Sequence, residues 1–341
     1  MQVALVGVSG YSGMVLYRLL KQHPAVDQVN LYGHQGGQLA ALKTVVPAFQ
    51  KETVNVRPFD AATVMTENAV LFCATSAGVT KTLVLPLIAA DFPVIDLSGD
   101  FRLPAATYTK WYHQAAAPVQ ALAKASYGLA EFNHRLTHYV ANPGCYATAT
   151  LLGLAPLVQQ HLLDPTSIVV DAKSGLSGAG KKLTATSQFT MVNDNLQLYK
   201  VNQHQHIPEI VQQLKQWWSA VPAIEFTTTL IPVTRGIMST IYAKAATPTT
   251  TAALLQAFQQ VYADQPFVQV LPAGEMPTLK QVIGSNDCVL GVNYNPVTKT
   301  ILVVSVIDNL MKGAAGQAIQ NFNQLFQLPA TAGLPSLPVF P

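Results

Sequence analysis

The chain has 341 residues, of which 50% are hydrophobic and 11% are charged, and its formal net charge is +3. At about 150 residues per domain, this length predicts two domains. The apolar composition excludes a disordered chain, and the weak positive charge, without a basic cluster, argues against a nucleic-acid partner. The apolar runs fall far short of the roughly 20 residues of a membrane-spanning helix, so no membrane partner is expected.

The three cysteines, Cys73, Cys145 and Cys288, show no paired spacing. The apolar N-terminus lacks the basic segment of a signal peptide and soon turns into a glycine loop. These features predict a cytoplasmic protein without disulfides and without a metal site.

The first part of the chain alternates strand and helix signals. Apolar runs predict buried strands at residues 3–6, 26–32, 70–73 and 93–97. Helical spacing of apolar residues occurs at 14–20 and 80–90. This alternation predicts βαβ units and an α/β domain with a parallel sheet of the Rossmann type.

After about residue 145, strand signals predominate. Strands are predicted at residues 168–172, 225–232, 237–245, 267–271, 288–294 and 301–307. Helices are predicted at residues 207–218, 252–262 and 312–325. This part is therefore expected to be an α+β domain with a mostly antiparallel sheet.

The first predicted strand ends in a glycine-rich turn, GVSGYSG at residues 7–13. Its glycines allow a tight turn and let backbone N–H groups approach a pyrophosphate, although an ordinary strand–helix connection would look similar. Its position after the first strand favours a dinucleotide. Tyr32 and Gly33, which end the next strand signal, are not followed by the acid that binds an NAD ribose, and this favours NADP. His34 could contact the 2′-phosphate or be a plain surface residue.

Cys145 is placed for reactivity. It follows Pro143-Gly144 and precedes an apolar segment, which predicts that it lies in the first turn of a helix. Backbone amides and the positive end of the helix dipole would there stabilise a thiolate, and also an oxyanion. The alternative is a buried, inert cysteine, which suits Cys73 and Cys288 better.

Two histidines precede another predicted helix. His204 and His206 could supply the base that a thiol nucleophile needs, and Glu209 is close enough in sequence to orient an imidazole. Such a pair could instead bind a metal, but no further ligand cluster occurs nearby. A plain surface pair is the third interpretation.

These motifs resemble those of the N-acetyl-gamma-glutamyl-phosphate reductase family, within the phosphorylating semialdehyde dehydrogenases. The similarity covers nearly the whole chain and is most specific at residues 142–149 (NPGCYATA), which carry the family nucleophile at Cys145. The other similar segments are residues 7–13, 96–103 (DLSGDFRL), 174–180 (SGLSGAG), 204–209 (HQHIPE) and 308–318 (DNLMKGAAGQA). The chain departs from the family at Gln205, where relatives carry Arg, and at Thr75-Ser76, where they often carry Pro-His.

The resemblance implies NADPH-dependent reduction of N-acetyl-glutamyl 5-phosphate to N-acetyl-glutamate 5-semialdehyde and phosphate, through a Cys145 thioester, in arginine biosynthesis. It implies an NADP-binding domain of residues 1–145 with 310–341 and a catalytic and oligomerisation domain of residues 146–309. A homodimer or homotetramer is expected.

The resemblance also implies site residues. The expected catalytic residues are Cys145, His204, His206 and Glu209, with His204 toward the oxyanion and His206 nearer the thiol. The expected cofactor contacts are Gly7, Ser9, Gly10, Tyr11, Ser12, Gly13, Thr75, Ser76, Ser174, Gly175 and Asn309. Since the substrate is a polyanion, cations should anchor it, and the expected substrate contacts are Asn142, Arg102, Ser177, Lys181 and Arg235. Arg235 and the Lys181-Lys182 pair could alternatively be surface charges.

Three other functions stay open. Aspartate-semialdehyde dehydrogenase, or a related phosphorylating aldehyde dehydrogenase, would use the same chemistry on another acyl chain. A thiol hydrolase or acyltransferase would use Cys145 with a purely structural glycine turn. A non-catalytic NADP sensor would not need the nucleophile.

Overall fold

The computed structural model describes residues 1–33, 38–335 and 337–339. It divides into two compact units. The first unit is Met1–Pro143 with Ala314–Leu334, and the second is Gly144–Gly313 with the chain end from Pro335. His34, for which the sequence left a 2′-phosphate contact and a plain surface residue as alternatives, lies outside the described residues.

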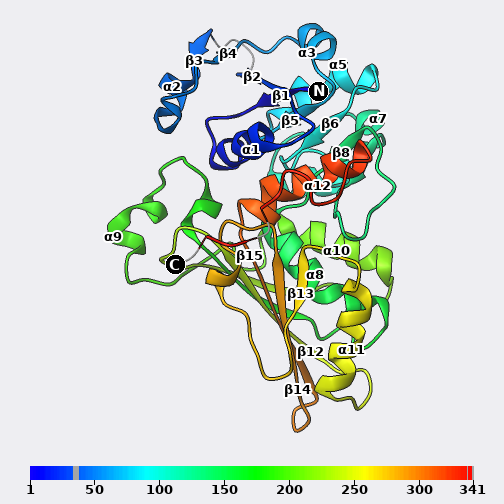
Figure 1. The fold of residues 1–341 in the computed structure, drawn as a ribbon. Helices are drawn as coiled ribbons and strands as arrows, with labels where there is room; N and C mark the ends of the chain where they lie inside the picture. The colour runs from blue at the N-terminus through cyan, green and yellow to red at the C-terminus, as the bar shows by residue number, and fades with distance from the viewer. Residues whose placement is uncertain (34–37, 336, 340–341) are drawn as a thin grey trace. The chain divides into compact units, whose positions relative to one another are not determined.

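The first unit contains an eight-stranded sheet with the order β3-β4-β2-β1-β5-β6-β8-β7 (Figure 1). Every pairing is parallel except that of β3 with β4, which confirms the predicted parallel sheet. Strands β5 and β6 are wholly buried, as expected for a parallel sheet covered on both faces. The strands are β1 (Gln2–Val6), β2 (Gln28–Tyr32), β3 (Ala40–Ala41), β4 (Asn55–Arg57), β5 (Leu71–Cys73), β6 (Val94–Asp96), β7 (Ala125–Tyr127) and β8 (Tyr139–Ala141).

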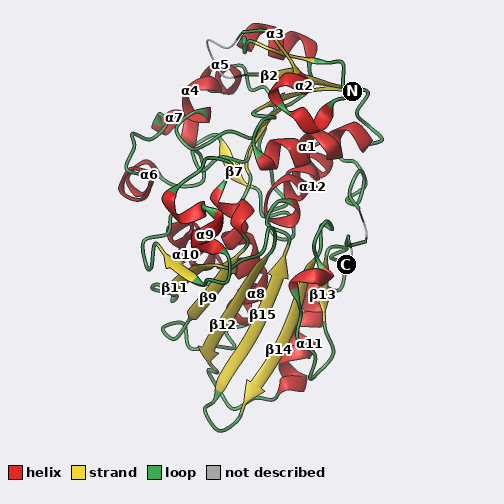
Figure 2. Cartoon of the chain, turned by 90° about the vertical axis from the view of Figure 1, so that its left-hand side faces the viewer, coloured by secondary structure: helices red, strands yellow, loops and turns green. Residues whose placement is uncertain are grey.

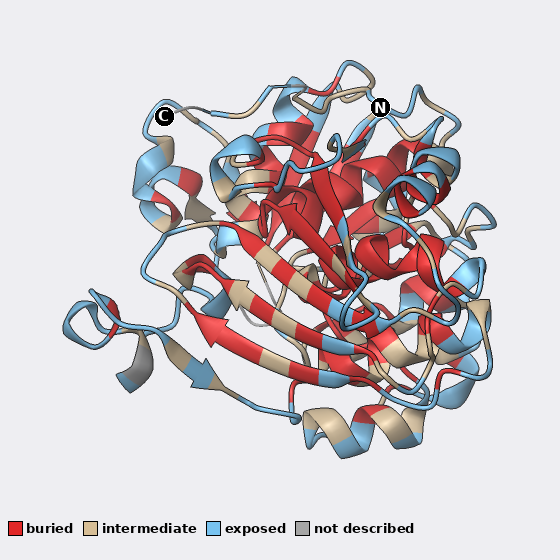
Figure 3. Ribbon diagram, turned by 90° about the horizontal axis from the view of Figure 1, so that it is seen from below, coloured by how far each residue is buried: buried red, intermediate tan, exposed pale blue. Residues whose placement is uncertain are grey.

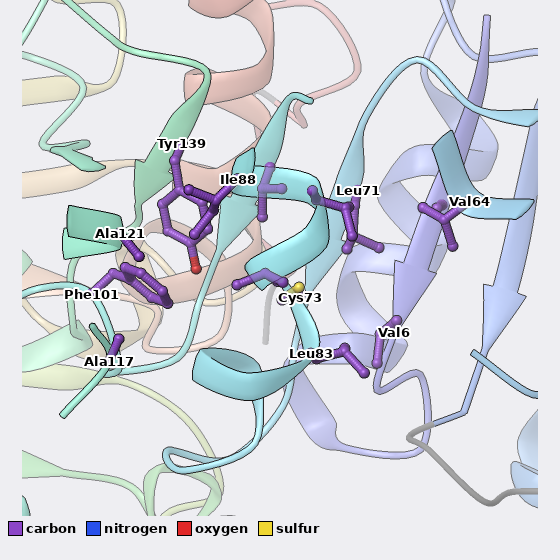
Figure 4. Packing of buried hydrophobic residues seen from close by; sticks show 14 of the residues in the cluster. Val6, Val64, Leu71, Cys73, Leu83, Ile88, Phe101, Ala117, Ala121 and Tyr139 are labelled. Carbon is purple, nitrogen blue, oxygen red and sulfur yellow. The ribbon is translucent and has the colours of Figure 1, made fainter. Parts of the chain in front are cut away.

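Short helices cover this sheet. They are α1 (Tyr11–Gln22), α2 (Leu42–Val45), α3 (Ala61–Glu67), α4 (Thr80–Leu83), α5 (Leu85–Ala89), α6 (Ala105–Tyr112), α7 (Val119–Leu122) and α12 (Gly316–Leu325). The prediction of a single helix over residues 80–90 was wrong, because the structure has two short helices there, α4 and α5, with a break between them. Pro86 is the second residue of α5, where it lacks an N–H and its ring obstructs the preceding turn. Figure 4 shows the core beneath these helices, in which Val6, Leu71 and Tyr139 come from three different strands.

The last predicted helix, over residues 312–325, begins instead as a π-helical turn, Met311–Ala315, and continues as α12. Phe322 of α12 packs against Phe72 of β5, with ring centroids 5.6 Å apart. His23, at the end of α1, shares a 2.9 Å hydrogen bond with Asn323. The C-terminal helix is therefore part of the core of the first unit.

The second unit contains a seven-stranded sheet with the order β10-β11-β9-β12-β15-β14-β13 (Figure 2). Only the β11–β9 and β13–β14 pairings are parallel, which confirms the predicted mostly antiparallel sheet. Burial alternates along β12, as in a sheet with one covered face. Figure 3 shows strands along which buried residues alternate with more exposed ones. The strands are β9 (Val169–Ser174), β10 (Gln197–Tyr199), β11 (Glu225–Leu230), β12 (Ile237–Lys244), β13 (Val268–Val270), β14 (Cys288–Asn295) and β15 (Thr300–Ile307). The helices are α8 (Cys145–Gln159), α9 (Phe189–Val192), α10 (His206–Trp217) and α11 (Thr251–Tyr262).

Helix α8 is buried on all sides from residue 146 to residue 158. Pro156 lies inside it and leaves the Leu152 carbonyl without its helical N–H donor. The Tyr262 hydroxyl of α11 donates to that carbonyl instead, so α8 is fixed to α11. None of the helices in the described part of the chain is long and apolar enough to cross a membrane.

Candidate active site

Cys145 is the first residue of α8, as predicted from the Pro-Gly turn before it. The N-cap is Gly144, and no side chain caps this helix end by a hydrogen bond. The first-turn amides and the dipole of a 15-residue helix therefore act on a half-buried thiol. Cys73 and Cys288 are fully buried, and none of the three cysteines forms a disulfide.

His206 begins α10 and lies directly against Gly144, the residue before Cys145. A Cβ built on Gly144 would be 2.3 Å from Nε2 of His206, so only glycine leaves room for this imidazole. His206 as a whole is 8% exposed. Among the described residues, no group of three or more His, Cys, Asp or Glu side chains could hold a metal ion.

Glu209 joins the two helix starts. Its Oε1 accepts a 2.8 Å hydrogen bond from the Gly144 N–H, and the residue is almost fully buried. The sequence suggested that this carboxylate would orient an imidazole. Its bond to the Gly144 amide shows a second task, which is to hold the start of α10, and therefore His206, against the start of α8.

The imidazole of His204 has a much lower pKa than an ordinary histidine. Its burial lowers its pKa from 6.5 to about 2, and the neighbouring His206 and Lys200 side chains act in the same direction, against a smaller opposing effect of Glu209. Nδ1 of His204 accepts the His206 backbone N–H at 3.2 Å. The imidazole is therefore neutral near pH 7 and carries its proton on Nε2, where it can act only as a hydrogen-bond donor.

Two tyrosines beside these histidines were missed by the sequence reasoning. The hydroxyls of Tyr146 and Tyr199 are 2.9 Å apart, and the Tyr146 ring meets the edge of His204 with centroids 5.2 Å apart. Burial raises the pKa of both, that of Tyr199 to about 12. Tyr146 adjoins Cys145 in the motif, whereas no sequence signal marks Tyr199.

The glycine turn of the first unit has the form of an anion cradle. Gly7 has φ +93°, and a Cβ there would lie 2.4 Å from the Ala74 carbonyl oxygen. A Cβ on Gly13 would lie 2.1 Å from the carbonyl oxygen of Gly7, so α1 can start this close only with glycine at that position. Gly10 is the N-cap of α1 and offers no side chain to the first amides, which leaves them for a phosphate.

A second loop follows β5 at the same edge of the sheet. Thr75 shares a 2.6 Å hydroxyl–hydroxyl bond with Thr80, and Ser76 is exposed. The Asp100 carboxylate accepts the N–H groups of Gly78 and Lys81, at 2.7 and 3.0 Å. The family-like DLSGDFRL segment therefore acts here by holding the neighbouring loop.

Arg102 and Asn142 use their polar groups within the first unit. Arg102 donates to the carbonyls of Asn142 and Leu97, at 2.8 and 2.7 Å. The Asn142 side chain donates to the Ala314 carbonyl at 3.2 Å and accepts from Asn321 at 2.8 Å. Both residues are buried and fix the chain just before Cys145, and their substrate roles stay predictions.

The remaining predicted residues lie in the second unit. Arg235 forms an ion pair with the fully buried Asp308 at 2.9 Å. Asn309 Nδ2 donates to the Ser177 hydroxyl at 3.0 Å, and its Oδ1 accepts the Gly236 N–H at 2.8 Å.

The loop after β9 passes close to this group. The Ser174 hydroxyl donates to the Gly175 carbonyl at 2.9 Å, and a Cβ on Gly175 would lie 2.8 Å from the backbone nitrogen of Arg235. Lys181 is exposed. Neither Asp308 nor this close approach was predicted, although both lie in or beside segments that the resemblance had marked.

Comparison with known families gives two matches that together span most of the chain. Residues 2–138 match the family model "Semialdehyde dehydrogenase, NAD binding domain", and residues 145–309 match "Semialdehyde dehydrogenase, dimerisation domain". The chain is 69% identical to "N-acetyl-gamma-glutamyl-phosphate reductase 2" of Lactiplantibacillus plantarum, over the whole of both chains. It is 55% identical to a reductase of the same name, without the numeral, from Limosilactobacillus fermentum, also over the whole of both chains.

Solved structures with a similar fold are more distant in sequence. Aspartate semialdehyde dehydrogenase II of Vibrio cholerae, complexed with ASA, superposes with a TM-score of 0.70 at 18% identity, covering 96% of this chain and 98% of that one. The Candida albicans aspartate semialdehyde dehydrogenase with NADP gives 0.71 at 14% identity, covering 95% and 98%. At these identities the likeness establishes the fold alone.

The lowered pKa of His204 predicts a pH-dependent stability. Between about pH 6.5 and the folded pKa, the unfolded chain binds a proton at this site that the folded chain does not, so acidification destabilises the fold by up to about 1.4 kcal/mol per pH unit. In urea unfolding between pH 7 and 5, we expect His204→Asn to lose less unfolding free energy on acidification than the unsubstituted chain. His113→Asn, at an exposed helix end, is the control and should follow the unsubstituted chain. Parallel curves for His204→Asn and the unsubstituted chain would contradict the assignment.

Proposed function

This chain belongs to the N-acetyl-gamma-glutamyl-phosphate reductase family, and on that premise we propose that it reduces N-acetyl-glutamyl 5-phosphate with NADPH through a Cys145 thioester. The products are N-acetyl-glutamate 5-semialdehyde and phosphate, and the reaction is a step of arginine biosynthesis. The observation that carries the proposal is the uncapped start of α8 at Cys145, with His206 against Gly144.

Cys145 is the nucleophile. Its thiolate attacks the acyl carbon, a carbon–sulfur bond forms, and the carbon–oxygen bond to phosphate breaks. The amides at the start of α8 stabilise the thiolate and the oxyanion of the addition step. A thioester delocalises less onto its carbonyl than an ester does, which makes it a better hydride acceptor than the ester would be.

The two histidines have different roles. His206 accepts the thiol proton, because its Nε2 lies next to the residue before the sulfur. His204 is neutral and can only donate from Nε2, a state suited to a hydrogen bond to the substrate oxyanion. This division agrees with the expectation from the resemblance.

The glycine turn fits a dinucleotide, since Gly7 and Gly13 leave the space that a pyrophosphate needs at the start of α1. Strand β2 ends at Tyr32 without an acid, which supports NADP. When bound, NADPH supplies the hydride for reduction of the thioester. The residues proposed to hold it are Gly7, Ser9, Gly10, Tyr11, Ser12, Gly13, Thr75 and Ser76 in the first unit and Ser174, Gly175 and Asn309 in the second.

Arg235 is the proposed anchor for the substrate anion. Asp308 holds one edge of its guanidinium, and the side chain keeps 23% of its surface exposed, so part of the fork can bind a carboxylate or phosphate. Ser177 and the exposed Lys181 complete this group of proposed contacts.

The substrate is tested in the reverse direction. With phosphate and NADP⁺, we expect N-acetyl-glutamate 5-semialdehyde to give a kcat/KM roughly 100-fold or more above that of aspartate semialdehyde, followed by NADPH absorbance. Cys145→Ala should reduce turnover at least about 1000-fold while NADP affinity stays the same. A preference for aspartate semialdehyde would favour the alternative dehydrogenase, and full activity of Cys145→Ala would favour the sensor. Thiol-dependent hydrolysis of an acyl ester without NADPH consumption would favour the hydrolase.

The histidine roles predict different pH profiles. We expect His206→Asn to lower kcat/KM about 100-fold or more and to flatten its fall between about pH 7 and 5, because the proton acceptor is gone. His204→Asn should lower the rate but keep the acidic fall, since His204 stays neutral over this range. The opposite assignment of the two profiles would contradict the proposal.

The family match to a dimerisation domain supports a homo-oligomer. Within the described residues, the segment 183–201 leaves large apolar side chains exposed, and a second copy could cover them. They are Leu183, Phe189, Met191, Leu196, Leu198 and Val201. We place the protein in the cytoplasm, since its three cysteines form no disulfide.

Light scattering tests the oligomer. We expect the mass of a dimer or tetramer of 36.6 kDa chains. Phe189→Asp, on a side chain that is 75% exposed, should weaken association roughly tenfold or more by placing a charge in the interface. Val297→Asp, on the exposed β14–β15 turn, is the control and should keep the mass. A single-chain mass without substitution would contradict the oligomer.

A further inference from the structure

To attack a substrate, the thiol of Cys145 must point in a fixed direction, in addition to being stabilised as a thiolate by the helix start. Its Cβ is attached to the first residue of α8, so whatever packs on that Cβ sets where the sulfur points. The element that packs there is the turn after β15, which none of the proposed catalytic roles uses.

Gly313 of this turn contacts the nucleophile directly. A Cβ built on Gly313 would lie 2.7 Å from Cys145 Cβ, closer than real Cβ atoms pack, and 3.2 Å from its Cα, which is tighter than most real contacts. The same Cβ would lie 3.3 Å from Cδ1 of Ile307. Gly313 does not have a positive φ, so its lack of a side chain serves this close approach and not a special backbone conformation.

The turn itself is held firmly. The Gly313 N–H donates to the Asp308 carbonyl at 3.0 Å, a π-type bond over five residues, and such turns often occur at functional sites. The Asp308 carboxylate accepts the Leu310 N–H at 2.8 Å and pairs with Arg235. Gly313 therefore cannot retreat easily from Cys145.

We propose that Gly313 is a positioning residue for the reaction, whose bare Cα against Cys145 Cβ fixes the direction of the thiol. This inference rests on the proposed function, in which Cys145 is the nucleophile. A methyl group at position 313 would displace the first residue of α8, because the atoms it meets are Cα and Cβ and not the flexible end of a side chain.

The test compares Gly313→Ala with Gly153→Ala, the same substitution within α8. A Cβ on Gly153 meets Cδ1 of Ile241 at 2.6 Å, which is the free end of a side chain and can turn away. We expect Gly313→Ala to lower kcat about tenfold or more, to change KM less than threefold, and to slow iodoacetamide alkylation of Cys145 by a similar factor. Cys73 and Cys288 are fully buried, so the folded protein should be alkylated at Cys145. Gly153→Ala should keep kcat and alkylation within twofold.

A second variant separates positioning from lost stability. Ile307→Val removes Cδ1 on the far side of the new methyl, so Gly313→Ala with Ile307→Val should regain part of kcat, whereas general destabilisation would lower it further. If Gly313→Ala alone does not fold, the double variant replaces it in the test, and Ile307→Val serves as its reference. Normal kcat and alkylation in the alanine variant would overturn the inference. An active Cys145→Ala variant would instead overturn the proposed function.

Discussion

One hydrogen bond, from the Gly144 amide to the buried Glu209 carboxylate, ties the start of α8 to the start of α10. A bond with an ionised acceptor is stronger and shorter than a neutral one, and burial of Glu209 keeps water from competing for it. Because α8 carries Cys145 and α10 carries His206, their placement depends on this contact.

Glycines, which have no side chain, shape this site by allowing close contacts between segments. Gly144 admits the His206 ring, and Gly313 admits the Cβ of Cys145. Gly7 has the same use in the first unit, where it passes close to the Ala74 carbonyl. In each case two parts of the chain approach more closely than any Cβ would allow.

The sequence was informative wherever a local signal decides the structure. The Pro143-Gly144 turn predicted the start of α8, and the alternation of strand and helix signals predicted the parallel sheet, because both signals are carried by residues close together in the chain. The Tyr146–Tyr199 contact, the Asp308–Arg235 pair and the π-helical turn could not be read in this way. They join segments far apart in the chain, or depend on a backbone form with no sequence signature. The break at Pro86 was a local signal that the apolar spacing of residues 80–90 obscured.

Helix α8 is enclosed by protein from its second residue almost to its end and is fixed to α11 through the Leu152 carbonyl. The Cys145 sulfur is thus attached to a rigid part of the second unit, whereas the proposed substrate contacts Lys181 and Arg235 lie on loops and Ser177 lies on a short 3-10 turn. With such a division, substrate specificity for the acyl chain could change through substitutions in the loops alone. Cys145 and the start of α8 would keep their structure during such an evolutionary change.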